Sequence, residues 1–371
     1  MRIARLVALL SALTILVSGC GGAPAAQPTS PPAATQSAAL TTASAAAPSA
    51  QATAPTAAAE AAPTQAAASG EAITLTLVAY STPREAYEEI IPLFLASPGG
   101  AGITFEQSYG TSGDQSRAVE NGLGADIVAL SLAPDVNRLI KSGLVTEDWA
   151  KDEYQGMVTD SVVVFAVRPG NPKNIKTWDD LIEPGIEVLT PNPVTSGGAR
   201  WNVMAAYGAQ TKTGKSHDQA VEYLRALFTN VVVQDKSARE SLQTFTGGKG
   251  DVLLAYENEV IFAKQNGQEL DYVVPDQTIL IENPVALVAS SKHPEQARAF
   301  IAFLRTQESQ KIYGEKGYRP VVKEVLAEFD YPTPPVLFTI ADFGGWSEVQ
   351  AKFFNAEDGI MTLINQGLGV Q

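Results

Sequence analysis

Apolar and polar residues follow two different rhythms along the chain from about residue 71 onward. Continuous or alternating apolar runs, as in ITLTLVAY (73–80), ADIVAL (125–130) and SVVVFAV (161–167), predict buried strands. Between such runs, apolar residues recur every three or four positions, as in PDVNRLIKSGLV (134–145), which predicts amphipathic helices. Strands that alternate with helices are typical of an α/β protein.

The same two patterns continue to the C-terminus. The other predicted strands are ITFEQSY (103–109), IEVLT (186–190), NVVVQD (230–235), DVLLAY (251–256), LDYVVP (270–275) and PVALVAS (284–290). The other predicted helices are 82–91, 112–123, 177–182, 196–208, 220–228, 237–245 and 257–266, and the C-terminal stretch is mostly helical. Roughly three hundred residues exceed what one core usually holds, so we expect two lobes, with the loops at the carboxyl ends of the strands lining the crevice between them.

Several predicted helices carry start and stop signals. Thr82 is placed to cap the helix after the first strand, with Glu85 closing a capping box, and Pro92 is expected to end or kink that helix. Ser112 is placed as the cap of the next helix, with Gln115 at its third position.

The first seventy residues have a different composition. Arg2 and Arg5 precede an apolar run (6–17), and small residues lead to Cys20, an arrangement that resembles the lipobox of bacterial lipoproteins. We therefore expect a lipoprotein signal peptide over 1–20 and a lipid anchor on Cys20. Residues 21–71 are rich in Ala, Pro, Thr and Ser and contain almost no charge, which predicts a disordered tether.

Charge and cysteine usage exclude several classes of function. The chain has 26 basic and 40 acidic residues, a net charge of −14. Without Arg2 and Arg5 the charge becomes −16, which disfavours nucleic acid as a partner. One cysteine allows no internal disulfide, and two histidines, His217 and His293, make no histidine-rich metal site. We expect neither a metal nor another cofactor.

Four loop-to-helix junctions share one chemistry. AYSTPRE, YGTSGDQ, TSGGARW and DKSARES each place small residues where a predicted helix begins. The first amides of a helix lack partners within it, and they point along the positive end of the helix dipole, so such junctions can bind anions. Plain helix capping explains any single junction, but four in order after strands favour an anion site.

Two readings of other polar residues stay open. Asp179 and Asp180, or Glu257 and Glu259, could act as acid–base pairs, although a capping role for the first pair and a surface role for the second are favoured. Ser112 in GTSGD could be the nucleophile of a surface hydrolase, but it lacks a nucleophile elbow and an obvious histidine base.

The chain contains a set of six short motifs, and their order along the chain matters as well as their sequences. They are TSGGARW, GDVLLAYENE, Y-x-x-x-RE after the first strand, G-x-SG-x-Q, VR-x-GNP and a terminal LFTI…FGGW. Together they resemble the sulfate-binding proteins of bacterial ABC importers. The resemblance implies a two-lobed type II periplasmic binding protein, each lobe a mixed sheet flanked by helices, with the ligand in the cleft between the lobes.

The resemblance also implies a ligand set of neutral donors around a dehydrated sulfate. These are the backbone N–H of Ser81, the N–H and hydroxyl of Ser112, the N–H groups of Gly197, Gly198 and Ala238, and a side-chain donor at Tyr256. The family often has aspartate at the position of Ser81, but it lends only its backbone amide. Its indole donor falls on the phenol of Tyr256, which reaches differently. Arg84, Arg200 and Arg239 are candidates for bracing these loops through their carbonyls, or they are solvated surface residues.

These implications give a specific expectation for function. The protein is expected to be a monomeric, non-enzymatic receptor that captures sulfate or thiosulfate outside the cytoplasm and passes it to an ABC permease. Molybdate or tungstate is the alternative ligand, because a donor-only site suits any unprotonated dianion whereas phosphate keeps a proton that needs an acceptor. The expected division is 72–158 for the first part of lobe I, 159–290 for lobe II, and 291–371 for a helical part that returns to lobe I.

Overall fold

A mixed β-sheet organises the part of the chain that the computed structural model describes, residues 73–369; Cys20 and the predicted leader and tether lie outside it. Its strands are β1 (Ile73–Tyr80), β2 (Ile103–Gly110), β3 (Ile127–Ala129), β4 (Met157–Val167), β5 (Val188–Pro191), β6 (Val231–Asp235), β7 (Val252–Tyr256), β8 (Asp271–Val273), β9 (Gln277–Leu287), β10 (Arg319–Pro320) and β11 (Val336–Phe338).

The strand order is β2-β1-β3-β9-β4-β7-β5-β6. At each end three strands run parallel, and the two central strands β9 and β4 run antiparallel to each other and to the strands beside them in this order; the short β11 pairs with β9 in parallel. Because parallel strands need crossover connections, helices lie between most of them in the sequence and cover the sheet.

Twelve α-helices occur in the described part of the chain; the first seven begin within three residues of a predicted start, and the others lie in the stretch that was predicted only to be mostly helical. They are α1 (Arg84–Ala96), α2 (Ser112–Glu120), α3 (Ala133–Lys141), α4 (Gly197–Lys212), α5 (His217–Thr229), α6 (Ala238–Thr246), α7 (Glu257–Gln265), α8 (Pro294–Phe303), α9 (Gln307–Glu315), α10 (Lys323–Leu326), α11 (Gly345–Phe353) and α12 (Ile360–Gly367). Short 3₁₀ turns occur at Pro98–Gly100, Asp179–Ile182 and Ile340–Phe343.

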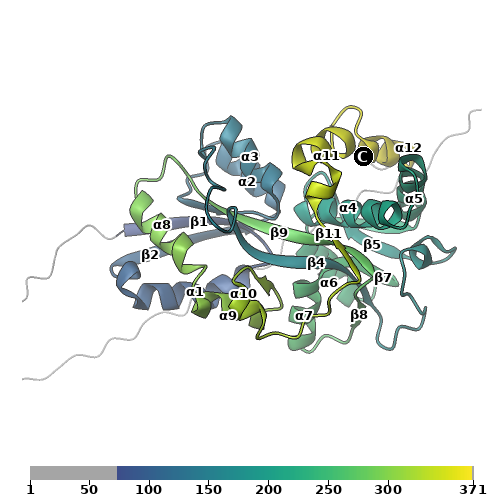
Figure 1. Cartoon of the computed structure of the whole chain (residues 1–371), viewed down its shortest axis with the longest axis horizontal. Helices are drawn as coiled ribbons and strands as arrows, with labels where there is room; N and C mark the ends of the chain where they lie inside the picture. The colour runs from purple at the N-terminus through teal and green to yellow at the C-terminus, as the bar shows by residue number, and fades with distance from the viewer. Residues whose placement is uncertain (1–72, 370–371) are drawn as a thin grey trace, which may run out of the picture. The chain divides into compact units, whose positions relative to one another are not determined.

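Apolar side chains form four core clusters, two on each half of the sheet (Figure 1). In the first half, α1, α8 and α9 cover one face of β1 to β3, and α2 and α3 cover the other. In the second half, α4, α5, α11 and α12 cover one face of β4, β5 and β7, and α6 and α7 cover the other. Each half therefore has the sandwich of helix, sheet and helix that the alternating sequence pattern predicts.

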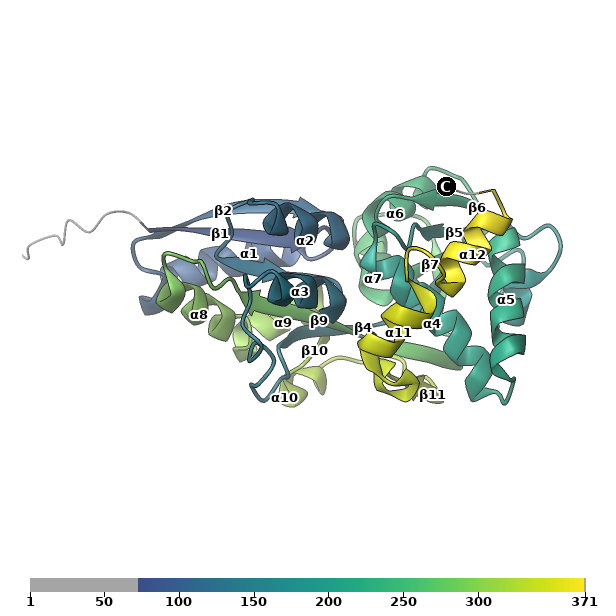
Figure 2. The ribbon, with the colours of Figure 1, turned by 90° about the horizontal axis from the view of Figure 1, so that it is seen from above.

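Strands β4 and β9 pass through both halves (Figure 2). In β4, Val158 packs in the first half, whereas Phe165 and Ala166 pack on opposite faces of the second. In β9, Ile281 packs in the second half and Val285 in the first. The prediction captured only the more apolar part of each strand, because the remaining residues include the polar segments at Asp160 and around Asn283.

Two predicted helix caps were wrong, and Pro92 does not end its helix. Helix α1 has no side-chain cap, because the Thr82 hydroxyl pairs with the Tyr318 hydroxyl at 2.9 Å, and the helix continues past Pro92 to Ala96. Thr111, not Ser112, caps α2: its hydroxyl accepts a hydrogen bond from the Asp114 amide. The cap lies one residue earlier because threonine can provide the same oxygen.

The C-terminal segment is divided between the halves, which corrects the expectation that 291–371 returns to the first one. Helices α8 and α9 pack against the first half, but α11 and α12 place Trp346 and Ile364 in the core around Trp201. The buried Trp178, Trp201 and Trp346 are core residues. Within residues 73–369, no helix has the length and apolar character needed to cross a membrane.

Candidate anion site

One small cavity lies where the two halves meet, and its wall is made of the starts of helices and the ends of strands. It is lined by residues 80–82 after β1, residues 110–112 at the start of α2, Ser131 after β3, residues 196–198 at the start of α4, residues 237–238 at the start of α6, and Tyr256 at the end of β7. All six residues predicted to bind an anion line this cavity: Ser81, Ser112, Gly197, Gly198, Ala238 and Tyr256. Every residue of the lining is uncharged.

The backbone amides at these helix starts are available as donors. Ser112, Gly197 and Ala238 are the first residues of α2, α4 and α6, so they have no acceptor one turn earlier within the helix. In the described part of the chain, none of these three amides, nor those of Ser81 and Gly198, donates to another backbone carbonyl in a turn or loop. The positive ends of three helix dipoles therefore meet at one place.

The paired glycines of TSGGARW are required by close packing. A Cβ on Gly197 would lie 2.0 Å from Leu132 Cδ2 and 2.4 Å from Ser131 Oγ. A Cβ on Gly198 would lie 3.0 Å from Tyr256 Cε2. Only glycine lets the start of α4 approach the residues after β3 and the ring after β7 so closely.

The hydroxyl of Ser112 is already engaged. It donates to Asp135 Oδ2 at 2.6 Å and accepts a hydrogen bond from the Ser131 amide at 3.0 Å. Burial raises the pKa of the Asp135 carboxyl, although the nearby Arg200 and the Ser112 hydroxyl oppose the shift. In this arrangement the hydroxyl proton of Ser112 already has a protein acceptor, whereas its backbone amide has none.

Tyr256 is almost completely buried, and its hydroxyl lies 2.6 Å from Ser131 Oγ. Burial raises the pKa of this phenol well above its usual value, so it remains protonated at neutral pH. Sequence reasoning did not select Ser131. The available signal was its position directly after a buried strand, where Ser81 also stands.

The three candidate bracing arginines have different environments. Arg200 Nε donates to the Pro193 carbonyl at 2.8 Å, in the loop before α4. Arg239 contacts the Thr82 carbonyl at 3.3 Å, but its main partners are the carboxylates of Glu85 and Glu259. Arg84 instead lies over the Tyr109 ring, 4.5 Å from its centroid.

Buried ion pairs stand directly behind the cavity wall. Glu257 and Glu259 were expected at the surface, but they are 0% and 1% exposed. Glu257 pairs with Arg319 at 2.8 Å and Glu259 with Arg239 at 2.9 Å. Burial opposes the charge of Arg239, but the carboxylates of Glu259 and Glu85 outweigh it and raise its pKa. These carboxylates can be buried because each has a guanidinium partner from a distant segment.

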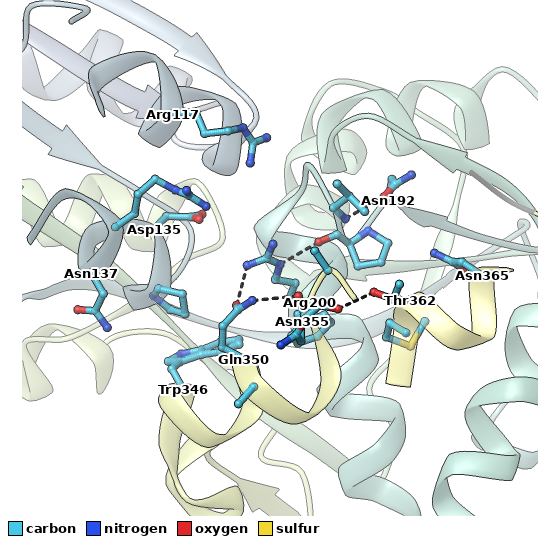
Figure 3. Close-up of a pocket in the computed structure, with 18 of the residues that line it drawn as sticks. Arg117, Asp135, Asn137, Asn192, Arg200, Trp346, Gln350, Asn355, Thr362 and Asn365 are labelled. Carbon is cyan, nitrogen blue, oxygen red and sulfur yellow. Dashed lines mark hydrogen bonds between the residues drawn. The ribbon is translucent and has the colours of Figure 1, made fainter. Parts of the chain in front are cut away.

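A second and larger groove, of about 1240 Å³, lies beside the cavity and was not predicted. Its lining includes Arg117, Asp135, Arg200, Trp346 and Gln350. Arg200 donates to the Pro193 carbonyl and to the Gln350 side chain. Figure 3 shows Asp135 and Arg117 on the elements that face Arg200. Unlike the cavity, the groove is lined by charged side chains of both signs.

The geometry does not match a hydrolase that uses Ser112. The partner of its hydroxyl is the carboxylate of Asp135, whereas His217 Nδ1 lies 2.9 Å from the Tyr207 hydroxyl and His293 stands at the start of α8. Among residues 73–369, no group of three or more His, Cys, Asp or Glu side chains could hold a metal ion.

Comparison with known proteins gives consistent matches over this region. Residues 75–319 match the family model described as bacterial extracellular solute-binding protein. A sulfate-binding protein of Synechococcus elongatus is 44% identical over 304 residues, covering 78% of this chain and 86% of the relative. A thiosulfate-binding protein of Pseudomonas aeruginosa is 35% identical and covers 77% of this chain and 91% of its own.

A solved structure matches the fold as well as the sequence. The sulfate-binding protein SubI from Mycobacterium tuberculosis H37Rv aligns with a TM-score of 0.74 and 44% identity, over 76% of this chain and all of the other. All six predicted site residues lie inside the segment that the family model matches.

Proposed function

Because the chain belongs to the bacterial extracellular solute-binding protein family, we propose that it captures sulfate or thiosulfate and delivers the anion to an ABC transporter permease. The family is one of binding proteins, not of enzymes. One observation carries the proposal: five free backbone amides and no charged side chain line a single cavity between the halves.

The chemistry of this lining suits an unprotonated dianion. Sulfate at neutral pH has only acceptor atoms, and the cavity offers amides and hydroxyls but no carboxylate oxygen. Charge-assisted hydrogen bonds contribute roughly 1.5 to 3 kcal/mol each, so a set of about six can offset the loss of water around the anion. Phosphate keeps a proton at neutral pH, and in this cavity that proton would face hydrogen-bond donors with no carboxylate to accept it.

The two halves act in the proposal as lobes that close on the ligand. In the proposal the first lobe holds most of 73–158 and the second most of 159–290, except that the end of β9 and the residues after it, such as Val285 and Val288, pack in the first; the helices after residue 290 are divided between the lobes. In the structure, contacts already connect the halves around the cavity: the Gly113 amide donates to the Thr195 carbonyl at 3.3 Å, and Lys236 pairs with Asp114 at 3.3 Å. An anion that contacts both lobes stabilises the closed state by its differential contacts.

The N-terminal segment supports a location at the membrane. The proposal places Cys20 as a lipid anchor and 21–71 as the tether of a monomeric receptor outside the cytoplasm. Expression of the full chain with Cys20→Ser is expected to move the protein from the membrane fraction to the soluble fraction. Equal membrane recovery of both forms would reject the anchor.

Titration calorimetry of the full chain tests the ligand. We expect tight binding of sulfate or thiosulfate and no detectable binding of phosphate at neutral pH. Molybdate or tungstate binding without sulfate binding would replace the ligand and keep the receptor role. Tight phosphate binding with no response to sulfate would contradict the proposal, because the lining offers phosphate no acceptor.

A further inference from the structure

A hydrogen bond between two hydroxyls crosses the cavity wall from one half to the other. Ser131 follows β3 in the first half, and Tyr256 ends β7 in the second. Their oxygens are 2.6 Å apart, and both residues line the cavity. The inference drawn from this pair rests on the proposed function, because it concerns how the same cavity holds its anion.

The number of protons limits what the pair can offer. Two hydroxyls carry two protons, and the bond between them uses one. The oxygen that accepts this bond keeps its own proton, which can point to a third group. The pair therefore presents one donor to an anion in the cavity. The Ser112 hydroxyl does not compete for this role while it donates to Asp135.

The direction of the bond decides which residue binds the anion. The distance between the two oxygens is compatible with either direction. A phenol is intrinsically a stronger acid than an aliphatic hydroxyl and hence the better donor, so we take Tyr256 as the donor and Ser131 as the acceptor. Burial keeps the phenol of Tyr256 protonated, as this direction requires.

Ser131 is also the more firmly held of the two. Its amide donates to Ser112 Oγ at 3.0 Å, and its carbonyl accepts from Trp201 Nε1 at 2.9 Å and Asn283 Nδ2 at 3.0 Å. The missing side chain of Gly197 leaves room for Ser131 Oγ beside the free amides at the start of α4. The Tyr256 ring packs instead against Gly198.

We infer that Ser131 donates a hydroxyl hydrogen bond to the bound anion, and that Tyr256 is a positioning residue that donates to Ser131 from behind. A chain of hydrogen bonds polarises its members, so the phenol makes the Ser131 hydroxyl a better donor. Because the two residues belong to different halves, the chain is complete only when the halves are together. Ser131 thus adds a contact that favours the closed state.

Sulfate titration of the full chain in four forms tests this inference: wild type, Ser131→Ala, Tyr256→Phe and the double variant. Ser131→Ala should weaken sulfate binding by about tenfold to a hundredfold, as expected for one charge-assisted hydrogen bond. Tyr256→Phe should weaken it by less than about tenfold, because the Ser131 donor remains. The double variant should resemble Ser131→Ala, because the phenol acts through Ser131.

Controls separate binding from folding. Ser241→Ala removes another fully buried serine hydroxyl, one outside the cavity lining, and should leave sulfate affinity unchanged. Ser131→Cys keeps nearly the same size with a weak donor and should lose affinity like Ser131→Ala, which keeps the test valid if the alanine variant folds poorly.

The possible outcomes are distinct. A larger loss in Tyr256→Phe than in Ser131→Ala would assign the donor to Tyr256 and overturn the inference, as would a Ser131→Ala variant within twofold of wild type. A wild-type protein that binds no sulfate or thiosulfate would instead overturn the proposed function, together with this inference.

Discussion

The cavity and the groove beside it are neighbours with opposite electrostatic designs. Ser112 in the cavity wall donates to Asp135, and Asp135 also lines the groove. The groove exposes guanidinium and carboxylate groups, among them Arg117 and Arg200 (Figure 3). The cavity exposes only amides, hydroxyls and small side chains. In a chain of net charge −14, the proposed anion site is therefore not made by local cations.

This difference shows how a charged side chain can position a binding site without lining it. Arg239 lies behind the cavity wall, where two carboxylates neutralise it while it holds the Thr82 carbonyl. It can fix the loop between β1 and α1 without adding a net positive charge at the site. Oriented amides then act as fixed partial charges that need no reorganisation when a dianion arrives.

Among variants that test whether Arg239 acts on the site only indirectly, Glu259→Gln should give the largest change in stability. It removes the more buried of the two carboxylates that pair with Arg239, the one that is 1% exposed, and leaves buried guanidinium donors with only Glu85, so we expect the free energy of unfolding to fall by about 3 kcal/mol in denaturant titration. Sulfate affinity should change less than tenfold, because Arg239 does not line the cavity. A gain in affinity above tenfold would show that the charge of Arg239 reaches the anion directly.

Gly197→Ala should have the next largest effect on stability and a direct effect on binding. The added Cβ would meet Leu132 and Ser131 at 2.0 and 2.4 Å, which forces the start of α4 away from the residues after β3. We expect a loss of about 2 kcal/mol in unfolding free energy and at least tenfold weaker sulfate binding. Gly124→Ala is the matched control, since its Cβ would meet nothing within 4 Å. Equal behaviour of the two variants would contradict the packing at Gly197.

Asp160→Asn should have the smallest effect, and one that depends on pH. Asp160 lies opposite Glu282 in the crossing strands, and burial, followed by repulsion from Glu282, raises its pKa to about 7. A carboxyl pKa that is raised in the folded state contributes stability that is full below about pH 4, the usual aspartate pKa, and is lost as the pH rises toward 7. Between pH 5 and 8, we expect the free energy of unfolding of the wild type to fall by about 1 to 2 kcal/mol more than that of the variant.

Sulfate titration at several pH values shows whether the pH effect concerns stability alone. The cavity lining has no group that titrates between pH 5 and 8, so sulfate affinity should stay constant over this range in both proteins. An Asp160→Asn variant with the same pH slope of stability as wild type would place the titrating group elsewhere.

Much of the fold could be predicted because its signals are local. The apolar runs located most of the strands, and small residues at TSGGARW and DKSARES marked the starts of α4 and α6. The first part of β9 was missed, although QTILIEN alternates, and so was the polar start of β4. Both segments lie in the strands that cross between the halves.

The sequence motifs predicted only part of the site. The six predicted residues were brought together in one cavity, but Ser131 was missed because its partners Tyr256 and Trp201 are distant in sequence. The burial of Glu257 and Glu259 was missed for the same reason, since it depends on Arg319 and Arg239. The one-residue error at Ser112 arose because Thr111 can cap the helix equally well.

A crystal structure of the full chain with sulfate is the decisive experiment on the anion site. We expect the anion in the cavity, within hydrogen-bond distance of the amides of Ser81, Ser112, Gly197, Gly198 and Ala238, with no guanidinium nitrogen touching it. A sulfate bound in the groove, in contact with Arg117 or Arg200, while the cavity holds none, would contradict this expectation.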